Sequence, residues 1–130
     1  MEVPAGEGPR PILDTPDLSI VLETSDDMVV ARVAGRLDGT TAESFRRAME
    51  SAPLGDHRTC LLDMADITFV ASEGLRALLL YRQFLSKNLC RLSLCSLQDS
   101  VQSVFQISGF TSVLAIYPDA EAAADDSPVP

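Results

Sequence analysis

The sequence predicts one α/β domain in which strands and helices alternate along the chain. Its 130 residues, 46% of them hydrophobic, suit one compact domain with a sizeable core but are too few for two. Short apolar runs typical of buried strands alternate with segments whose apolar residues recur at helical spacing. Strands that alternate with helices are usually parallel and joined by crossovers. We therefore expect a four- to five-stranded mixed sheet with helices packed mainly on one face.

The N-terminal part of the chain is expected to pass from a disordered tail to a hairpin and a helix. Residues 1–16 are rich in Pro, Gly and Glu and lack periodicity, so we expect them to be disordered. Residues 18–34 contain two strand-like runs separated by a polar turn, which predicts an antiparallel hairpin. A helix should begin at Thr40 or Thr41 and end near residues 53–55, where Pro and Gly interrupt it.

The remainder of the chain repeats the order of strand and helix. We expect three strands at residues 59–64, 91–95 and 112–117, and two helices at about 72–87 and 98–107. Gly109 lies just past the second of these helices, at a position that favours a left-handed C-terminal cap. A short Ala-rich helix should follow Pro118, and residues 125–130 should form a disordered tail. The predicted domain spans residues 17–124.

Negative charge is concentrated at the two ends of the chain. The formal net charge is −9, of which residues 1–27 carry −6 and residues 119–130 carry −4, leaving the middle at +1. Acidic ends oppose binding to nucleic acids and to anionic membranes, because both require a basic face. The chain also lacks a signal-like N-terminus and an apolar run of membrane-spanning length. We expect a cytoplasmic protein with neither a nucleic-acid nor a membrane partner.

Residue types suited to catalysis or metal binding do not form a recognisable site in the sequence. Cys60, Cys90 and Cys95 include no C-x-x-C pair, and we expect buried reduced thiols. His57 is the only histidine, so a metal site would lack ligands. It also precedes Ser72, whereas the α/β-hydrolase order places the histidine after the nucleophile. The sequence predicts no catalytic residue, no metal site and no cofactor.

Ser72 lies at the junction between an apolar strand-like run and the predicted helix at 72–87. A serine at this point is a candidate N-cap, whose hydroxyl accepts a hydrogen bond from a backbone N–H within the first turn. A phosphate there would meet free N–H groups and the positive end of the helix dipole. Ser72 is therefore either a structural cap or a regulatory site.

The predicted helix at 72–87 has a polar side on which one leucine stands out. Glu73, Arg76 and Leu80 follow this side at spacings of three or four residues. Leu80 is either a contact for a partner or a residue at the edge of the buried face, since single exposed leucines are ordinary. The buried stripe is expected to comprise Leu75, Leu78 and Leu79.

Asp38 lies in a glycine-bracketed turn, Gly-Arg-Leu-Asp-Gly at 35–39, between the hairpin and the next helix. An acid near a helix start interacts favourably with the helix dipole, and such residues are typical of turns. The alternative interpretation is that Asp38 belongs to a binding surface.

Three phrases of the sequence resemble the STAS domain of bacterial anti-sigma factor antagonists. The most specific is Leu-Leu-Asp-Met-Ala-Asp-Ile-Thr-Phe-Val-Ala-Ser-Glu-Gly-Leu-Arg at 61–76. Two supporting phrases are Gly-Arg-Leu-Asp-Gly-Thr-Thr-Ala at 35–42 and Ser-Val-Phe-Gln-Ile-Ser-Gly-Phe at 103–110. The resemblance covers about residues 17–124 and implies a STAS-like single domain.

The resemblance also implies a function and a set of functional residues. In that family the serine at the position of Ser72 is phosphorylated by an anti-sigma factor that is also a serine kinase of the GHKL ATPase type. The resemblance implies a non-enzymatic module that binds this kinase when unmodified, so that a sigma factor is released. The phosphorylated module leaves the kinase, and a serine phosphatase restores the unmodified form. The family's usual Asp-Ser-Ser-Gly is replaced here by Ala71-Ser72-Glu73-Gly74. From this resemblance and the residue patterns above, the expected partner-binding residues are Asp38, Ala71, Ser72, Glu73, Arg76 and Leu80.

Two other functions are compatible with the same residues. In a STAS subunit of a transporter or a signalling scaffold, Ser72 would have only a structural role. A small-ligand domain would instead bind a nucleotide or lipid with the loops at 35–40 and 65–72. The identity of a co-purifying partner distinguishes these possibilities.

Overall fold

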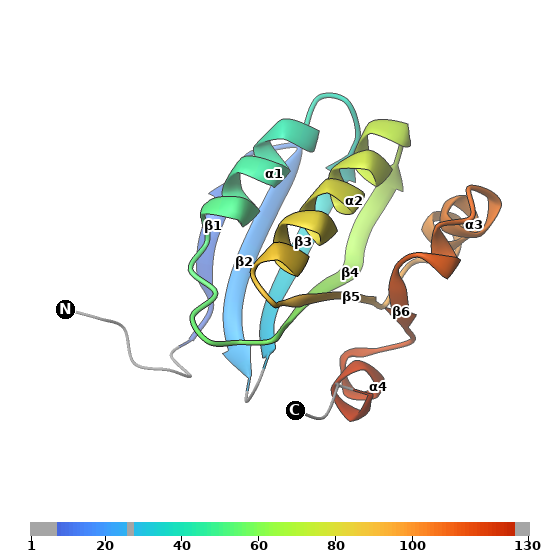
Figure 1. Cartoon of the computed structure of the whole chain (residues 1–130). Helices are drawn as coiled ribbons and strands as arrows, with labels where there is room; N and C mark the ends of the chain where they lie inside the picture. Colours follow the sequence, from blue (N-terminus) through green and yellow to red (C-terminus); the bar gives the residue numbers. More distant parts are fainter. Residues whose placement is uncertain (1–7, 26–27, 127–130) are drawn as a thin grey trace.

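The computed structural model describes residues 8–25 and 28–126 of the chain. The strands of this part are β1 (Arg10–Asp14), β2 (Leu18–Ser25), β3 (Met28–Leu37), β4 (Thr59–Val70), β5 (Arg91–Cys95) and β6 (Ala115–Tyr117). They form one mixed sheet in the order of the sequence, with β1 and β6 at its edges (Figure 1). The first three strands pair antiparallel, and β4, β5 and β6 continue the sheet in parallel pairs.

The helices of the described residues are α1 (Ala42–Ser51), α2 (Ser72–Lys87), α3 (Asp99–Ile107) and α4 (Ala120–Asp125). Figure 1 shows α1 and α2 side by side across one face of the sheet, and buried residues of α3 join the same core. On the opposite face, Ala123 of α4 packs with Leu61 and Cys95. These findings confirm the predicted α/β class and the placement of most helices on one face.

Several elements have the bounds that their sequence patterns predict. The hairpin is present as β2 and β3, which pair antiparallel from Leu18 opposite Gly35 to Ser25 opposite Met28. The bounds of α2 and β5 agree with the predicted ranges. β4 is longer than predicted, because its parallel pairing with β3 continues as far as Leu37 opposite Val70. This extension carries the strand almost to Ser72.

The predicted strand count was one too low, because β1 lies in a segment that we expected to be disordered. Arg10–Asp14 pairs antiparallel with β2, and Ile12 and Leu13 pack against the main core. A five-residue strand with two inward apolar side chains gives little local signal, and its stability comes from pairing with a neighbour. Residues 1–7 and 127–130, where the tails were also expected, lie outside the described part of the chain.

The chain after α3 differs from its predicted course. Gly109 has φ +78°, which confirms the left-handed position expected after the helix. Phe110–Ser112 then forms a short 3-10 helix, so that β6 begins at Ala115 rather than at residue 112. The short Ala-rich helix is present as α4, and Asp119 caps it by accepting a hydrogen bond of 2.8 Å from the Ala122 N–H.

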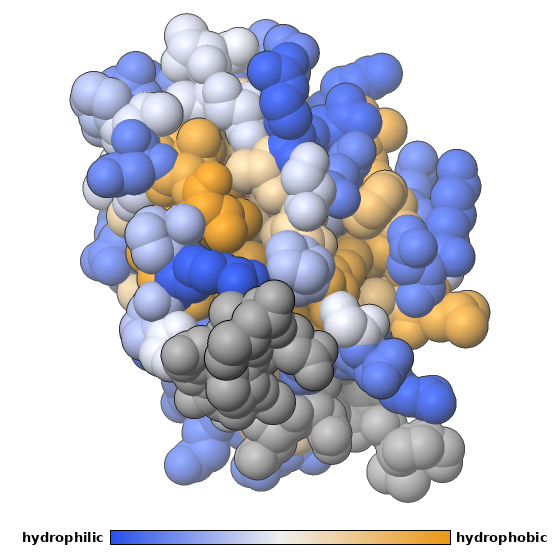
Figure 2. All heavy atoms as spheres, turned by 90° about the vertical axis from the view of Figure 1, so that its left-hand side faces the viewer, coloured by the Kyte–Doolittle hydropathy of each residue, from blue (hydrophilic) through white to orange (hydrophobic). Residues whose placement is uncertain are grey.

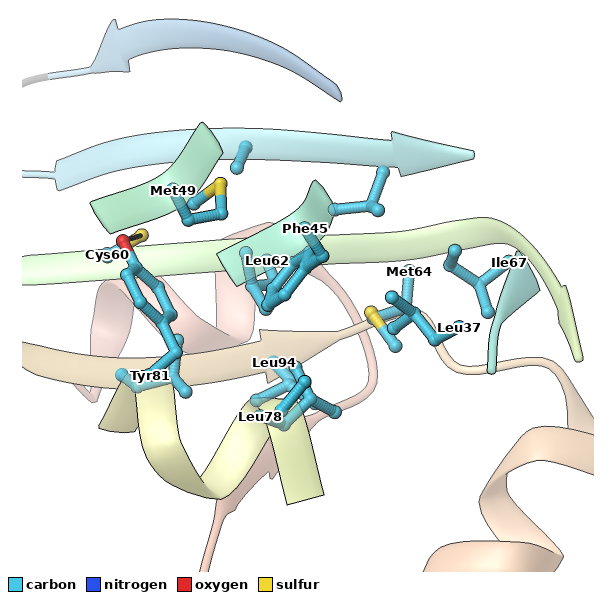
Figure 3. Close-up of a cluster of buried hydrophobic side chains, with 14 of the residues drawn as sticks. Leu37, Phe45, Met49, Cys60, Leu62, Met64, Ile67, Leu78, Tyr81 and Leu94 are labelled. Carbon is cyan, nitrogen blue, oxygen red and sulfur yellow. Dashed lines mark hydrogen bonds between the residues drawn. The ribbon is translucent and has the colours of Figure 1, made fainter. Parts of the chain in front are cut away.

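The main core lies between the sheet and helices α1 and α2. Phe45 of α1 and Tyr81 of α2 meet edge to face with ring centroids 5.9 Å apart, and both are fully buried (Figure 3). Burying an aromatic side chain of this size stabilises the fold by about 1.5–3 kcal/mol. The Tyr81 hydroxyl lies 3.6 Å from the Cys60 sulfur. Burial raises the pKa of the Cys60 thiol to about 12, so this cysteine stays protonated.

The remaining cysteines are also free and buried, as the sequence predicts. Burial raises the pKa of both Cys90 and Cys95, which makes their thiols unreactive. No helix within residues 8–25 and 28–126 is long and apolar enough to cross a membrane.

Candidate functional site

Ser72 is the first residue of α2 and is exposed. The N-cap position is held by Ala71, which has extended backbone angles and no polar side chain, so of the two interpretations of Ser72 the one as N-cap was wrong. The reason is the extension of β4: the Ala71 N–H still donates to the Leu37 carbonyl at 2.9 Å, and the chain turns into the helix only after this bond. Among the described residues, the Ser72 hydroxyl has no hydrogen-bond partner. A structural reason for a serine at this position is therefore absent.

Gly74 explains how α2 can begin so close to the sheet. A Cβ on Gly74 would overlap with the carbonyl group and the Cβ of Leu37 at the end of β3. Only glycine therefore allows this close approach. Gly74 was not singled out from the sequence, although a glycine in the first turn of a helix with an apolar face is a recognisable signal of close packing. Its consequence is that the start of α2, with Ser72, is held firmly on β3.

The loop between β3 and α1 lies beside the first turn of α2. A Cβ built on Gly39 would lie 3.5 Å from the carboxyl carbon of Glu73, so the two segments are in contact distance. Residues more than thirty positions apart in the sequence are thereby brought together. The structure places the loop that contains Asp38 next to Ser72 and Glu73, as a joint binding surface requires.

Asp38 is buried and holds this loop together. Its side-chain oxygens accept hydrogen bonds of 2.7 Å from the Thr40 hydroxyl, 3.0 Å from the Thr40 N–H and 3.0 Å from Arg36 Nε. The Thr40 hydroxyl and then Arg36 lower the pKa of Asp38 to about 2. The carboxylate is therefore ionised at neutral pH and points into the loop, with only 8% of the residue exposed. Asp38 therefore supports the surface beside Ser72 by holding the loop in its conformation, and little of Asp38 itself is part of that surface.

Arg36 and Phe69 form a second, exposed part of this surface. They are paired residues of β3 and β4, and the Arg36 guanidinium lies 4.7 Å from the centre of the Phe69 ring. This is the geometry of a cation–π contact. Phe69 is 44% exposed, which is unusual for a large aromatic residue, and it lies three positions before Ser72. Neither residue was singled out from the sequence, because an aromatic residue in a strand usually indicates core.

The outward side of α2 carries charge and some apolar surface. Glu73 and Arg76 are exposed, whereas Ala71 and Leu80 are half-buried. Leu79, which we expected in the buried stripe with Leu75 and Leu78, is also only half-buried. Leu79 and Leu80 are not among the half-buried residues that pack against the main core of the described chain. This leaves Leu80 accessible at one side of the site.

The groups around Ser72 decide which chemistry this surface can perform. A hydroxyl without a hydrogen-bonding base stays protonated and weakly nucleophilic. Within the described residues, no three His, Cys, Asp or Glu side chains could hold a metal ion together. A firmly held helix start with an exposed serine, next to a second loop, is a surface that a partner protein can reach.

The chain belongs to the STAS domain family, whose model matches residues 19–123. Its relatives include anti-sigma factor antagonists, which are non-enzymatic binding modules, and the resemblance found in the sequence is thereby confirmed. The protein of Bordetella bronchiseptica named "Putative anti-sigma factor antagonist BtrV" is 30% identical over 107 residues, or 82% of this chain and 92% of BtrV.

Two solved structures are similar over nearly the whole domain. The anti-sigma factor antagonist SpoIIAA in its unphosphorylated form is 27% identical with a TM-score of 0.66, covering 82% of this chain and 93% of that chain. SpoIIAA of Bacillus in the phosphorylated form is 26% identical with a TM-score of 0.59, covering 82% of this chain and 96% of that chain. The same fold thus accommodates both an unmodified and a phosphorylated state in this relative.

Proposed function

We propose that this chain is a phosphoswitchable anti-sigma factor antagonist that acts in the cytoplasm. In the unmodified state it binds an anti-sigma factor that is also a GHKL-type serine kinase, and a sigma factor is released. The kinase phosphorylates Ser72, the complex dissociates, and a serine phosphatase restores the unmodified form. The observation that carries this proposal is the exposed Ser72 hydroxyl, which contributes no hydrogen bond to the described structure.

The start of α2 suits a phosphate. The first N–H groups of a helix lack intrahelical acceptors and form its positive end. A phosphoserine adds about −1.5 to −2 charges at neutral pH. Since Ser72 is the first residue of a sixteen-residue helix, this charge is stabilised locally and the fold should survive it. The phosphate therefore weakens the complex with the partner and leaves the fold stable.

Arg76 is placed to respond to the same modification. It lies four residues after Ser72, so that both side chains project from the same side of α2. It is exposed and forms no ion pair within the described part of the chain. We propose that Arg76 pairs with an acidic residue of the partner before phosphorylation and with the phosphate afterwards. This exchange weakens the complex in addition to direct repulsion.

The two residues beside Ser72, Ala71 and Glu73, differ in charge from the family's usual pattern. The acid that the family usually places before the serine is absent, and Glu73 supplies a carboxylate one residue after it, next to Gly39. We propose that the kinase reads Glu73 in place of that acid. Phe69 and Leu80 add apolar area on either side, and Asp38 fixes the loop that completes the interface.

The proposal is tested by phosphorylation with a GHKL-type kinase encoded beside this chain. Incubation with ATP should add one phosphate, located at Ser72 by intact-mass measurement and peptide mapping, and Ser72→Ala should abolish it. Ser100, an exposed serine in the first turn of α3, provides the matched control. Ser100→Ala should leave the reaction unchanged. A phosphate located mainly at Ser100 or elsewhere would remove the assignment.

A further inference from the structure

A groove of about 600 Å³ lies between β1 and α1, away from Ser72. Figure 2 views this side of the molecule, where hydrophobic surface is gathered next to hydrophilic side chains. The apolar residues that line the groove are Ile12 and Leu13 from β1, and Ala48, Ala52 and Pro53 from α1 and the residues after it. This volume is within the range of small-molecule sites in proteins. None of the groove residues belongs to the site around Ser72.

An irregularity in β1 builds one wall of the groove. The pairing with β2 shifts between Pro11 and Leu13, so that Ile12 is an extra residue in the strand. Successive residues of a regular strand point to opposite faces, but a bulge re-aims one of them. As a result Ile12 and Leu13, although adjacent in sequence, both pack toward the core side and both line the groove.

The opposite wall is a row of small residues on α1. Ser44, Ala48 and Ser51 follow one side of the helix at spacings of four and three and leave the groove open. The large apolar residues of α1, Phe45 and Met49, point into the main core and do not fill this space. The wall therefore combines apolar surface with two hydroxyl groups.

Two arginines give the groove a charge opposite to that of the whole chain. Arg10 and Arg47 both line it, and no acidic residue does among residues 8–25 and 28–126. Arg47 is exposed and bonded to Glu43 at 2.6 Å, an exposed pair within one turn of helix that exchanges easily. The chain as a whole has a net charge of −9, but this groove combines positive charge with apolar side chains. It is therefore complementary to an amphipathic anion.

We propose that this groove binds a free long-chain monocarboxylate, that is, a fatty acid anion. The carboxylate would pair with Arg47 and Arg10, and the apolar chain would lie along Ile12, Leu13 and Ala48. A peptide adding to the edge of the sheet is less favoured by the backbone of β1. Pro11 has no N–H, and the bulge at Ile12 interrupts the regular order of donors that a further strand requires.

Dodecanoate below its micelle concentration is the probe, titrated into the full chain by calorimetry. One molecule should bind per chain, whereas dodecanol and acetate, which lack the charge or the apolar chain, should bind much more weakly. Arg47→Gln and Arg10→Gln should each weaken binding about two- to five-fold, the worth of one exposed ion pair. Glu43→Gln should strengthen binding, because it frees Arg47 from its competitor.

Arg46→Gln is the matched control, since Arg46 precedes Arg47, pairs with Glu50 and does not line the groove. It should leave the affinity unchanged. Ser51→Trp places bulk in the groove from an exposed position and should prevent binding without a change in melting temperature. The proposal would be overturned if dodecanoate did not bind, or if dodecanol bound equally well. It would also be overturned if Arg46→Gln and Arg47→Gln had equal effects, or if only anionic vesicles or acidic peptides bound. Because the groove does not include Ser72, failure here leaves the proposed phosphoswitch intact.

Discussion

The hydroxyl of Ser72 can be removed or replaced by charge with little effect on folding, because it is exposed and bonds to no described residue. Ser72→Ala should change the free energy of unfolding by less than about 0.5 kcal/mol and should keep kinase binding. Ser72→Asp should fold equally well but lose most binding, because a fixed acid supplies part of the phosphate charge. Calorimetric binding measurements with thermal melts distinguish the two effects. Equal affinity of the kinase for wild type and Ser72→Asp would argue against a switch, and Ser100→Asp is the control.

Leu89 combines two unfavourable features in the turn between α2 and β5. Its φ is +58°, a left-handed conformation that glycine adopts at lower cost, and its side chain is 87% exposed. Leu89→Gly should therefore stabilise the protein by about 0.5–1 kcal/mol, since relief of strain exceeds the greater freedom of the unfolded chain. Chemical denaturation measures the difference. Ser86→Gly, the same kind of change at an exposed position within α2, is the control and should destabilise the protein. An equal loss of stability in the two variants would contradict the strain at Leu89.

At the scale of secondary-structure elements, the contact between α2 and β3 depends on Gly74. Gly74→Ala should cost about 1–3 kcal/mol of stability, because the added methyl group overlaps with backbone atoms of Leu37 and α2 must shift. Kinase binding should weaken with it, since Ser72 moves with the helix. Gly39→Ala is the control: its added methyl group would meet only the Glu73 side chain at ordinary contact distance. Unfolding curves in which the two variants are equally stable would show that α2 is not held by this contact.

The outward side of α2 is tested at Leu80. Because Leu80 is half-buried and does not pack with the main core, Leu80→Asp should lower stability by about 1 kcal/mol or less but should weaken kinase binding at least tenfold. Gln83→Asp introduces the same charge at an exposed position on that side and should have a smaller effect on binding. A loss of several kcal/mol in Leu80→Asp would instead place Leu80 in the core.

At the scale of the whole molecule, Asp38 links stability to pH. Its pKa is lowered from the usual 3.8 to about 2 in the folded state, so the unfolded chain binds this proton more readily. The stabilisation is fully present above about pH 4 and is lost as the pH falls to 2. Asp38→Asn should be less stable than wild type at neutral pH, and the difference should shrink between pH 4 and 2. Urea denaturation at several pH values measures this. A difference that stays constant with pH would contradict the low pKa.

The local patterns of the sequence were sufficient for most of the fold and for the position of the site. Alternating apolar residues predicted the hairpin of β2 and β3, and helical spacing predicted α2 from residue 72 onward. These signals are local: side-chain periodicity follows from the geometry of a strand or helix itself. The strand-to-helix junction at Ser72 could be found in the same way, because it is where one periodicity replaces the other.

Other features depended on contacts between distant segments, which periodicity does not encode. β1 exists because Arg10–Asp14 pairs with β2, and its bulge at Ile12 helps to form the groove beside α1. Asp38 is buried and hydrogen-bonded within a folded loop, and Phe69 is exposed near the end of β4. The sequence by itself determined most of the strands and helices and the strand-to-helix junction at which Ser72 lies. Only the tertiary structure decided that Ser72 is free of a capping role and that Glu73 meets the loop at Gly39, because pairing and burial are set by the whole chain.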